Sequence, residues 1–133
     1  MNKTNSYSSP EKLKSRKALE SLFTSGQSFS VFPVKVFYTL DPVAADEPRE
    51  TPVNAGVGVS SKNFRKAVQR NRIKRLLREA YRTQKQTLLA AVKEQQHVSV
   101  FFLYIGKELP EFALLNQSMG KALEKFIEKL NKA

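Results

Sequence analysis

The run VSVFFLYI at residues 98–105 restricts the fold of this chain more than any other segment does. It is apolar on both faces of a β-strand, whereas a strand with one solvated face alternates apolar and polar residues. With about eight residues it is also too short to cross a bilayer. We therefore expect a central strand that other elements cover on both sides.

Two earlier segments are also predicted to be strands. VFPVKVFYTL, residues 31–40, is rich in β-branched and aromatic residues, and its Pro33 suits an edge strand or a strand start. TPVNAGVGVSS, residues 51–61, alternates valine and alanine with asparagine, glycine and serine. A turn-rich segment, residues 41–50, joins the two. We therefore expect them to pair as a hairpin with a long loop.

Helices are expected near both ends of the chain. The first runs from about residue 16 to residue 25, because Ser15 can cap it and Gly26 suits its end. The last starts at Asn116 or Ser118. Its apolar residues recur at helical spacing along one stripe, and they are Met119, Ala122, Leu123, Phe126, Ile127 and Leu130.

A third predicted helix, about residues 66–83, contains the basic segment QRNRIKRLLREAYR and can continue with a break beyond residue 83. On a helical wheel its apolar residues fall within a sector of about 140°. They are Ile73, Leu76, Leu77, Ala80 and Tyr81. The opposite side carries Asn71, Arg72, Lys74, Arg75, Arg78 and Arg82. The pattern weakens in the first turn, where Arg70 faces the edge of the core and Val68 faces the basic side.

The element order α, β, β, α, β, α predicts an α+β fold, namely a two-layer α/β sandwich with a mixed sheet and a basic helix. A chain of 133 residues is expected to form a single domain, residues 1–133. Residues 1–11 are polar and rich in serine, and we expect a disordered tail there.

Positive charge is concentrated around the basic helix. Residues 62–82 hold nine basic residues and one acidic residue, so they carry eight of the eleven net positive charges of the chain. Like charges on one helix face cost a few tenths of a kcal/mol per close pair, and a solvated face normally mixes signs. The expected partner is a polyanion, first a nucleic acid and second an anionic membrane surface. Arginine, which outnumbers lysine here, suits bidentate phosphate contacts.

Catalytic and metal-binding patterns are not evident in the sequence. The chain has no cysteine, which fits a reducing compartment. Its single histidine, His97, is interpreted as a structural or surface residue. The nearest group of carboxylates is interpreted as a hydrated loop, and it consists of Asp41, Asp46, Glu47 and Glu50. No apolar run follows the first residue, so no secretory signal is expected.

The stretch KAVQRNRIKRLLREAYR, residues 66–82, resembles the signature of the protein subunit of bacterial ribonuclease P. In that family an A-x-x-R-N-R-x-K-R-x-x-R-E run forms a helix. Here the run is present as Ala67, Arg70, Asn71, Arg72, Lys74, Arg75, Arg78 and Glu79. GVGVSSKNFRKAV resembles the strand before that helix, and SLFTSGQSF resembles the family's first helix with its closing glycine. The resemblance covers about residues 12–130, a ribonuclease P protein-like domain.

The resemblance implies a function in which the protein does not perform the chemistry. Proteins of this family are the small subunit of a ribonucleoprotein endonuclease, whose RNA uses Mg²⁺ to remove the 5′ leader from precursor tRNA. We accordingly expect a cytoplasmic RNA-binding subunit that binds the catalytic RNA and the leader. We expect it to be monomeric in the holoenzyme, without a tightly bound cofactor or a membrane partner. The family fold also implies a left-handed β-α-β crossover, against the general rule for such connections.

The resemblance further implies a surface for the RNA subunit. Its cations would neutralise about six phosphates and position the RNA, without reading bases, with a log–log salt slope of roughly −4 to −5. The expected residues are Lys62, Arg65, Lys66, Arg70, Asn71, Arg72, Lys74, Arg75, Arg78 and Arg82.

A second implied site is a cleft for the leader between the first helix and the sheet, where unpaired bases stack on aromatic side chains. The expected residues are Phe23, Tyr38, Leu19 and Phe37, with Phe32 as a further candidate. Leu19 stands where the family has an aromatic residue, which weakens stacking at that point. Gly56 and Gly58 are expected to leave a low floor between the strands.

Three other functions remain alternatives at this point. A ribosomal or chaperone-like basic RNA-binding protein would share the basic helix and the mixed fold. A DNA-binding helix-turn-helix protein would need a helix just before Asn63, where the sequence predicts a strand. A protein-only nuclease would cleave RNA without an RNA subunit, and we expect no such activity.

Overall fold

The computed structural model describes residues 20, 22–24, 26–42, 53–92 and 96–132. Residues 20 and 22–24 are helical, as predicted for the first helix; the rest of that helix and the tail at residues 1–11 lie outside the described residues. The elements that follow are β1 (Gln27–Val31), β2 (Val34–Pro42), β3 (Val53–Val59), α2 (Ala67–Ala91), β4 (Gln96–Tyr104) and α3 (Phe112–Lys132).

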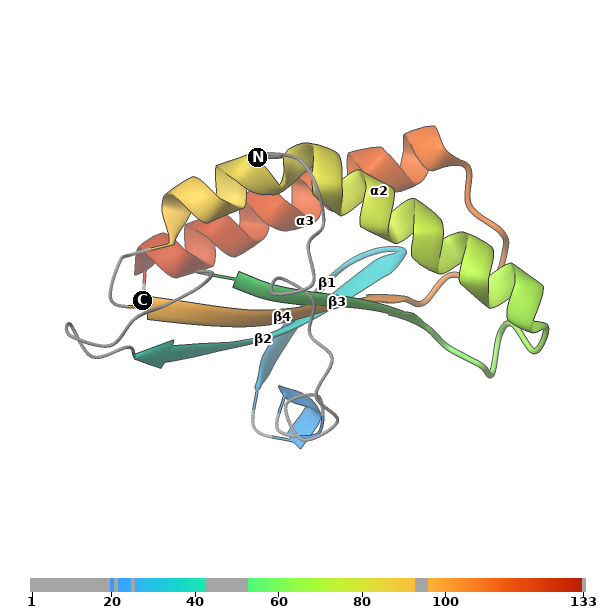
Figure 1. Ribbon diagram of the computed structural model, residues 1–133, viewed down its shortest axis with the longest axis horizontal. Helices are drawn as coiled ribbons and strands as arrows, with labels where there is room; N and C mark the ends of the chain where they lie inside the picture. Colours follow the sequence, from blue (N-terminus) through green and yellow to red (C-terminus); the bar gives the residue numbers. More distant parts are fainter. Residues whose placement is uncertain (1–19, 21, 25, 43–52, 93–95, 133) are drawn as a thin grey trace, which may run out of the picture.

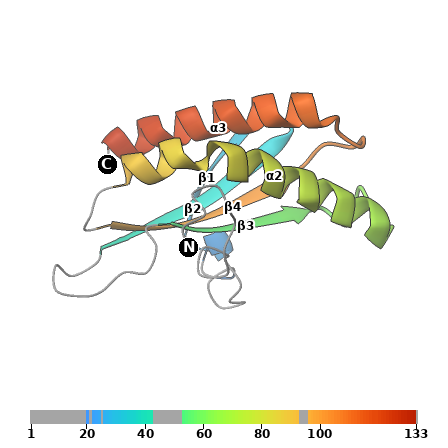
Figure 2. The same ribbon diagram turned by 45° about the horizontal axis from the view of Figure 1, so that its top comes forward.

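The four strands form one mixed sheet in the order β1-β2-β4-β3. The pairs β1–β2 and β2–β4 are antiparallel, and β3–β4 is parallel. Helices α2 and α3 lie side by side over one face of the sheet, and helical residues 20 and 22–24 lie on the opposite side (Figures 1 and 2). The α+β class with a mixed sheet is confirmed, whereas the hand of the β3–α2–β4 crossover stays a prediction from the resemblance.

The predicted hairpin between residues 31–40 and 51–61 is wrong. β4 lies between β2 and β3, so that Phe101 is opposite Phe37 on one side and beside Gly56 on the other. The physical reason is that β4 is apolar on both faces. A position at the centre of the sheet removes more of this apolar surface from water than an edge position would. Chain order alone does not reveal that a later strand inserts between two earlier ones. The prediction that this apolar run is a central strand is confirmed, because β4 has a strand on each side.

Strand β1 was not predicted, and it pairs with β2 in place of the expected hairpin partner. Phe32 and Pro33, joined by a cis peptide bond, form the turn that sets Val31 opposite Val34. The sequence QSFSV of β1 has three polar residues among its five. An edge strand needs fewer apolar residues than a central one, so its pattern is too weak to be recognised.

The core lies between the sheet and the two helices. Alternate residues of the strands point into it, and they include Val34, Val36, Tyr38, Val53, Ala55, Val98, Val100, Phe102 and Tyr104. The predicted stripe of α3 packs against them, although α3 already begins at Phe112, earlier than expected.

Helix α2 runs without a break to Ala91, so the predicted interruption beyond residue 83 is absent. Gln84 links it to α3, because its side-chain amide donates to the main-chain oxygen of Asn116 at 3.0 Å and to the Oδ1 atom of Asn116 at 2.8 Å. Leu88 continues the buried stripe by one more turn. Among the helices of the described residues, none combines the length and the apolar character that crossing a membrane requires.

Candidate nucleic-acid interface

The core holds the basic side of α2 in a fixed orientation. Ile73, Leu77, Ala80 and Tyr81 are buried on the inner side of the helix, and Leu76 packs half-buried beside them, as the wheel predicts. The outer side, which we call the basic strip, consists of the exposed Asn71, Arg72, Arg75 and Arg78 and the half-buried Lys74 and Arg82. Since the inner side cannot rotate out of the core, the strip stays directed toward solvent.

An entry loop, residues 60–66, precedes the helix and adds further exposed cations. Its main chain turns on itself, because Asn63 and Phe64 both donate to the carbonyl of Ser60 at 3.3 Å. Phe64 is buried with its ring 6.0 Å from that of Tyr104. Anchored in this way, the loop leaves three predicted site residues exposed, namely Lys62, Arg65 and Lys66.

Arg70 braces the entry loop against the helix. Its Nη1 atom donates to the carbonyls of Phe64 at 2.9 Å and Arg65 at 2.6 Å, and the side chain is half-buried. Val68, in contrast, is 80% exposed. The irregular first turn that the wheel predicted is therefore present. Because Arg70 uses a guanidinium nitrogen to hold the main chain at Phe64 and Arg65, its main role is to position the entry loop and the cations on that loop.

The far end of the basic strip is partly neutralised. Arg82 binds the carboxylate of Glu79 with Nη2–Oε1 and Nε–Oε2 distances of 2.5 and 3.2 Å. The hydrogen bond from Arg82 lowers the pKa of Glu79, and the same bond raises the pKa of Arg82. Arg82 was predicted to belong to the surface for the RNA subunit, and its guanidinium has a carboxylate partner within α2.

On the sheet face turned away from α2 and α3, three aromatic rings of the described residues lie together, one from the first helix and two from the strands. Phe23 lies with its ring 5.0 Å from Phe37 and 5.3 Å from Phe101, edge-on to both, at interplanar angles of 82° and 87°. The Nζ atom of Lys35 is 5.1 Å from the centre of the Phe37 ring. Phe23 is 48% exposed and the other two rings are half-buried. We call Phe23, Phe37 and Phe101 the aromatic cluster.

Glycine in β3 makes room for this cluster. A Cβ atom at Gly58 would lie 2.5 Å from the Phe101 ring, closer than any van der Waals contact allows. The strand is therefore flat where the ring rests on it. The prediction that the glycines leave a low floor is confirmed at Gly58, but the ring of Phe101 covers that floor.

Tyr38 was predicted for the leader cleft, and the structure shows that this is wrong. It is 4% exposed and points to the helices, where its ring lies 4.7 Å from Phe126. Its hydroxyl donates to Oε1 of Gln27 at 2.8 Å, and burial raises the pKa of Tyr38. Neighbouring residues of a strand point to opposite faces, so with Phe37 outward Tyr38 must point inward.

The other residues predicted for the leader cleft do not join the aromatic cluster in the described part of the structure, and one member of the cluster was not predicted. Leu19 lies outside the described residues. Phe32 is exposed, but it belongs to the β1–β2 turn and takes no part in the aromatic cluster. Phe101 was missed, because β4 is apolar on both faces and its sequence does not show which residues point outward. The pairing of Phe101 with Phe37 supplies that information.

The histidine and the carboxylates that were considered for catalysis show no catalytic arrangement among the described residues. His97 is half-buried, and a ring nitrogen shares a hydrogen bond with the side-chain oxygen of Asn54, joining β4 to β3. Asp46, Glu47 and Glu50 lie outside the described residues. Within the described ranges, no three histidine, aspartate or glutamate side chains gather in a way that could hold a metal ion.

Comparison with known proteins gives consistent relatives. The family model described as Ribonuclease P matches residues 8–127. The ribonuclease P protein component of Porphyromonas gingivalis (strain ATCC 33277) is 38% identical over 117 residues, which cover 87% of this chain and 82% of the relative. The component of Chlorobium phaeobacteroides is 37% identical over 127 residues, covering 90% and 86%.

Solved structures support the same fold. The Staphylococcus aureus RNase P protein superposes with a TM-score of 0.62 at 19% identity, covering 86% of this chain and 93% of that one. The Thermotoga maritima RNase P protein gives a TM-score of 0.61 at 22% identity, covering 86% and 96%. At these identities the likeness concerns the fold alone.

Proposed function

Because the chain belongs to the ribonuclease P protein family, we propose that it is the RNA-binding subunit of a ribonuclease P, in which the RNA performs catalysis. In this proposal the protein binds the catalytic RNA and the 5′ leader of precursor tRNA, so that the ribonucleoprotein acts as an endoribonuclease. The observation that carries the proposal is the basic strip with its entry loop, anchored on the core and nearly free of acids.

The proposed contact with the RNA subunit is electrostatic. Six cations of the predicted surface are exposed, and they are Lys62, Arg65, Lys66, Arg72, Arg75 and Arg78. If each neutralises one phosphate, log Kd depends on log salt concentration with a slope of magnitude roughly 4 to 5. Arginine forks bind phosphate oxygens in pairs, which fixes orientation as well as affinity. No base readout is needed for this contact.

The proposed leader site is the sheet face that carries the aromatic cluster. Phe23 offers the most accessible ring, and Lys35 supplies a cation beside Phe37. Stacking on aromatic rings tolerates any base sequence, because every base has a π face. Such a surface suits leaders that differ among precursor tRNAs.

In this proposal the RNA binds the Mg²⁺ that the reaction requires. The ion helps the RNA to fold and activates the attacking water molecule. The described residues offer no ligand cluster for such an ion, so we derive no step through a protein-bound metal. We further propose a monomeric subunit that acts in the cytoplasm. The protein's own contribution is to hold RNA and leader together by charge and stacking.

Reconstitution tests the proposal directly. Cleavage of a precursor tRNA by the ribonuclease P RNA is measured at low Mg²⁺ with and without the full-length protein. We expect a clear gain in kcat/KM for precursors with a leader, since the protein supplies cations that the RNA lacks under these conditions. An absence of any gain would contradict the proposal, and cleavage by the protein alone would indicate a protein nuclease instead.

A further inference from the structure

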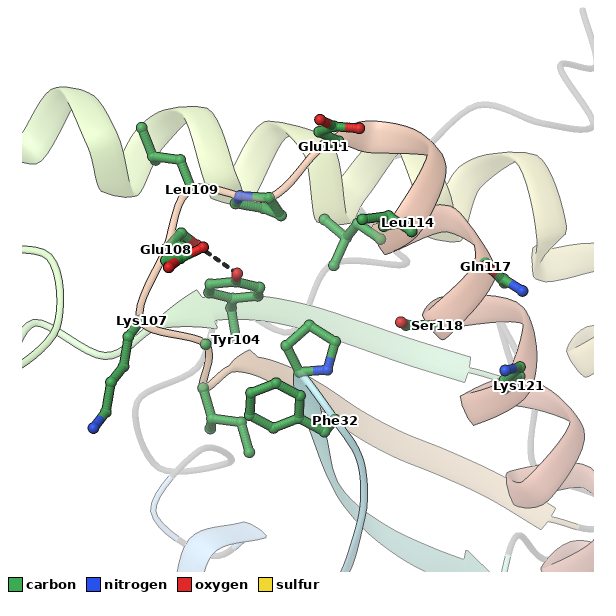
Figure 3. A pocket seen from close by; sticks show the side chains of 15 residues that line it. Phe32, Tyr104, Lys107, Glu108, Leu109, Glu111, Leu114, Gln117, Ser118 and Lys121 are labelled. Atoms are coloured by element: carbon green, nitrogen blue, oxygen red, sulfur yellow. Dashed lines mark hydrogen bonds between the residues drawn. The ribbon is translucent and has the colours of Figure 1, made fainter.

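An apolar groove lies beside the entry loop, apart from the basic strip and the aromatic cluster. It has a volume of about 660 Å³ and lies between the β1–β2 turn, the connection at residues 105–111 and the first turns of α3. Figure 3 shows Phe32 on one side and Leu109 and Leu114 on the other. All three are exposed, and Phe32 is 73% exposed. Large apolar side chains that stay in water around a hollow indicate a binding site.

The walls of the groove are fixed before anything binds. The amide of Ile105 donates to the carbonyl of Pro33 at 2.8 Å, which joins the β1–β2 turn to the end of β4. The hydroxyl of Tyr104 donates to the carbonyl of Glu108 at 2.6 Å (Figure 3). A Cβ atom at Gly106 would meet the Tyr104 hydroxyl at 2.4 Å, so glycine is needed there. A preformed groove loses little conformational entropy on binding.

The groove adjoins the cationic entry loop. The side-chain amide of Asn63 donates to the carbonyl of Gly106 at 3.3 Å, and Gly106 lines the groove. Phe64 packs against Tyr104, which lines it as well. Lys107 and Lys121 lie at opposite ends of the groove (Figure 3). A polyanion bound along the entry loop would therefore pass the mouth of the groove.

We propose that this groove binds one unpaired nucleobase of the RNA whose phosphates contact the basic strip and the entry loop. Phe32 provides a flat face for stacking, and Leu109 and Leu114 close the opposite side. Glu108 and Glu111, which also line the groove, keep the phosphates outside at the lysine ends. A second copy of this chain is disfavoured as the occupant, because it too carries a net charge of +11. The inference rests on the proposed function.

Substitution of Phe32 tests the inference. Loss of one stacked base typically weakens binding about tenfold, so Phe32→Ala should raise the Kd for a transcript of the ribonuclease P RNA by that factor. The salt slope should stay unchanged, because no phosphate contact is lost. Phe112→Ala is the matched control, since Phe112 is 37% exposed on α3 but does not line the groove. It should bind as the parent does.

A fluorescent variant gives an independent readout. The chain has no tryptophan, so Phe32→Trp introduces a single indole into the groove, and Phe112→Trp introduces one outside it. We expect Phe32→Trp to retain affinity for the transcript and to be quenched by it far more strongly than Phe112→Trp. Retained affinity shows that the aromatic face, not phenylalanine itself, is what the RNA requires.

The outcomes separate this inference from the proposed function. If the parent binds the transcript with a steep salt slope while Phe32→Ala binds equally well and Phe32→Trp is not quenched, only the groove inference fails. If the parent ignores the transcript, both fail. If Phe32→Ala instead alters sedimentation of the protein without RNA, the groove is an interface between copies and the inference is wrong.

Discussion

The basic strip on α2 and the aromatic cluster on the far face of the sheet are both open to solvent, yet they are organised differently. The cations of the strip project singly from a helix whose inner side is buried. In the cluster, the ring of Phe23 contacts the rings of both Phe37 and Phe101, edge-on to each. Independent side chains contribute additively, whereas side chains in contact do not. Substitutions in the strip should therefore reduce RNA affinity additively, whereas substitutions in the cluster should reduce leader affinity non-additively.

The largest expected effect is a loss of folding stability, and it differs between the two faces of β2. Tyr38→Ala removes a buried ring that contacts Phe126, so it should reduce the free energy of unfolding by about 3–5 kcal/mol. Phe37→Ala should cost much less stability, because that ring is only half-buried. Urea unfolding followed by circular dichroism measures both.

Tyr38→Phe is the control for this comparison. It keeps the ring and loses only the hydrogen bond to Gln27, so it should cost about 1 kcal/mol. Leader affinity should stay at the parent value in Tyr38→Phe. A stable Tyr38→Ala variant that bound leader poorly would reverse the assignment of the two faces.

The next largest effect is a loss of RNA affinity when arginines of the basic strip are replaced. Arg72→Ala combined with Arg75→Ala should weaken binding of the ribonuclease P RNA without changing the circular dichroism spectrum. Both side chains are exposed, so the core is unaffected. The magnitude of the salt slope should fall by roughly two, one for each lost phosphate contact. Lys125→Ala combined with Lys132→Ala, both at exposed positions of α3, controls for the loss of two charges alone. An unchanged slope in the double variant would remove these arginines from the interface.

The strip could be predicted residue by residue because a helix separates its faces by 100° per residue and the two faces differ in chemistry. Even the departure at Arg70 and Val68 followed from the wheel. The pairing of Arg82 with Glu79 was not anticipated, since three-residue spacing permits an ion pair but does not require one.

The sheet could be predicted only in part, because a strand that is apolar on both faces does not indicate which residues point outward. Phe101, on β4, was therefore missed until its pairing with Phe37 was known. Tyr38 was assigned wrongly although β2 alternates, with Val34, Val36 and Tyr38 on one face and Lys35, Phe37 and Thr39 on the other. Pairing with a strand about sixty residues away is a long-range property, and local pattern cannot specify it.

A smaller effect tests whether the cluster acts as a unit. Phe23→Ala should weaken the affinity of the reconstituted ribonucleoprotein for precursor tRNA by about 1–2 kcal/mol and leave mature tRNA unaffected. Phe101→Ala should have a similar effect, because the ring that supports Phe23 is lost. The double variant should lose less than the sum of the two. Strict additivity would mean that the rings bind independently.

The smallest effect is expected at the far end of the strip, where the comparison between paired and unpaired cations is sharpest. Because Arg82 already binds Glu79, Arg82→Ala should weaken RNA binding less than Arg75→Ala does, and Glu79→Gln should strengthen it slightly. The pair also predicts a pH dependence. The pKa of Glu79 is lowered, so the contribution of the pair is complete above the ordinary carboxyl pKa and is lost as the pH falls through the lowered value. In an NMR titration, Arg82→Ala should return the Glu79 midpoint toward its ordinary value. If Arg82→Ala matched Arg75→Ala in RNA affinity, Arg82 would exchange Glu79 for phosphate on binding, and the whole strip would act as one surface.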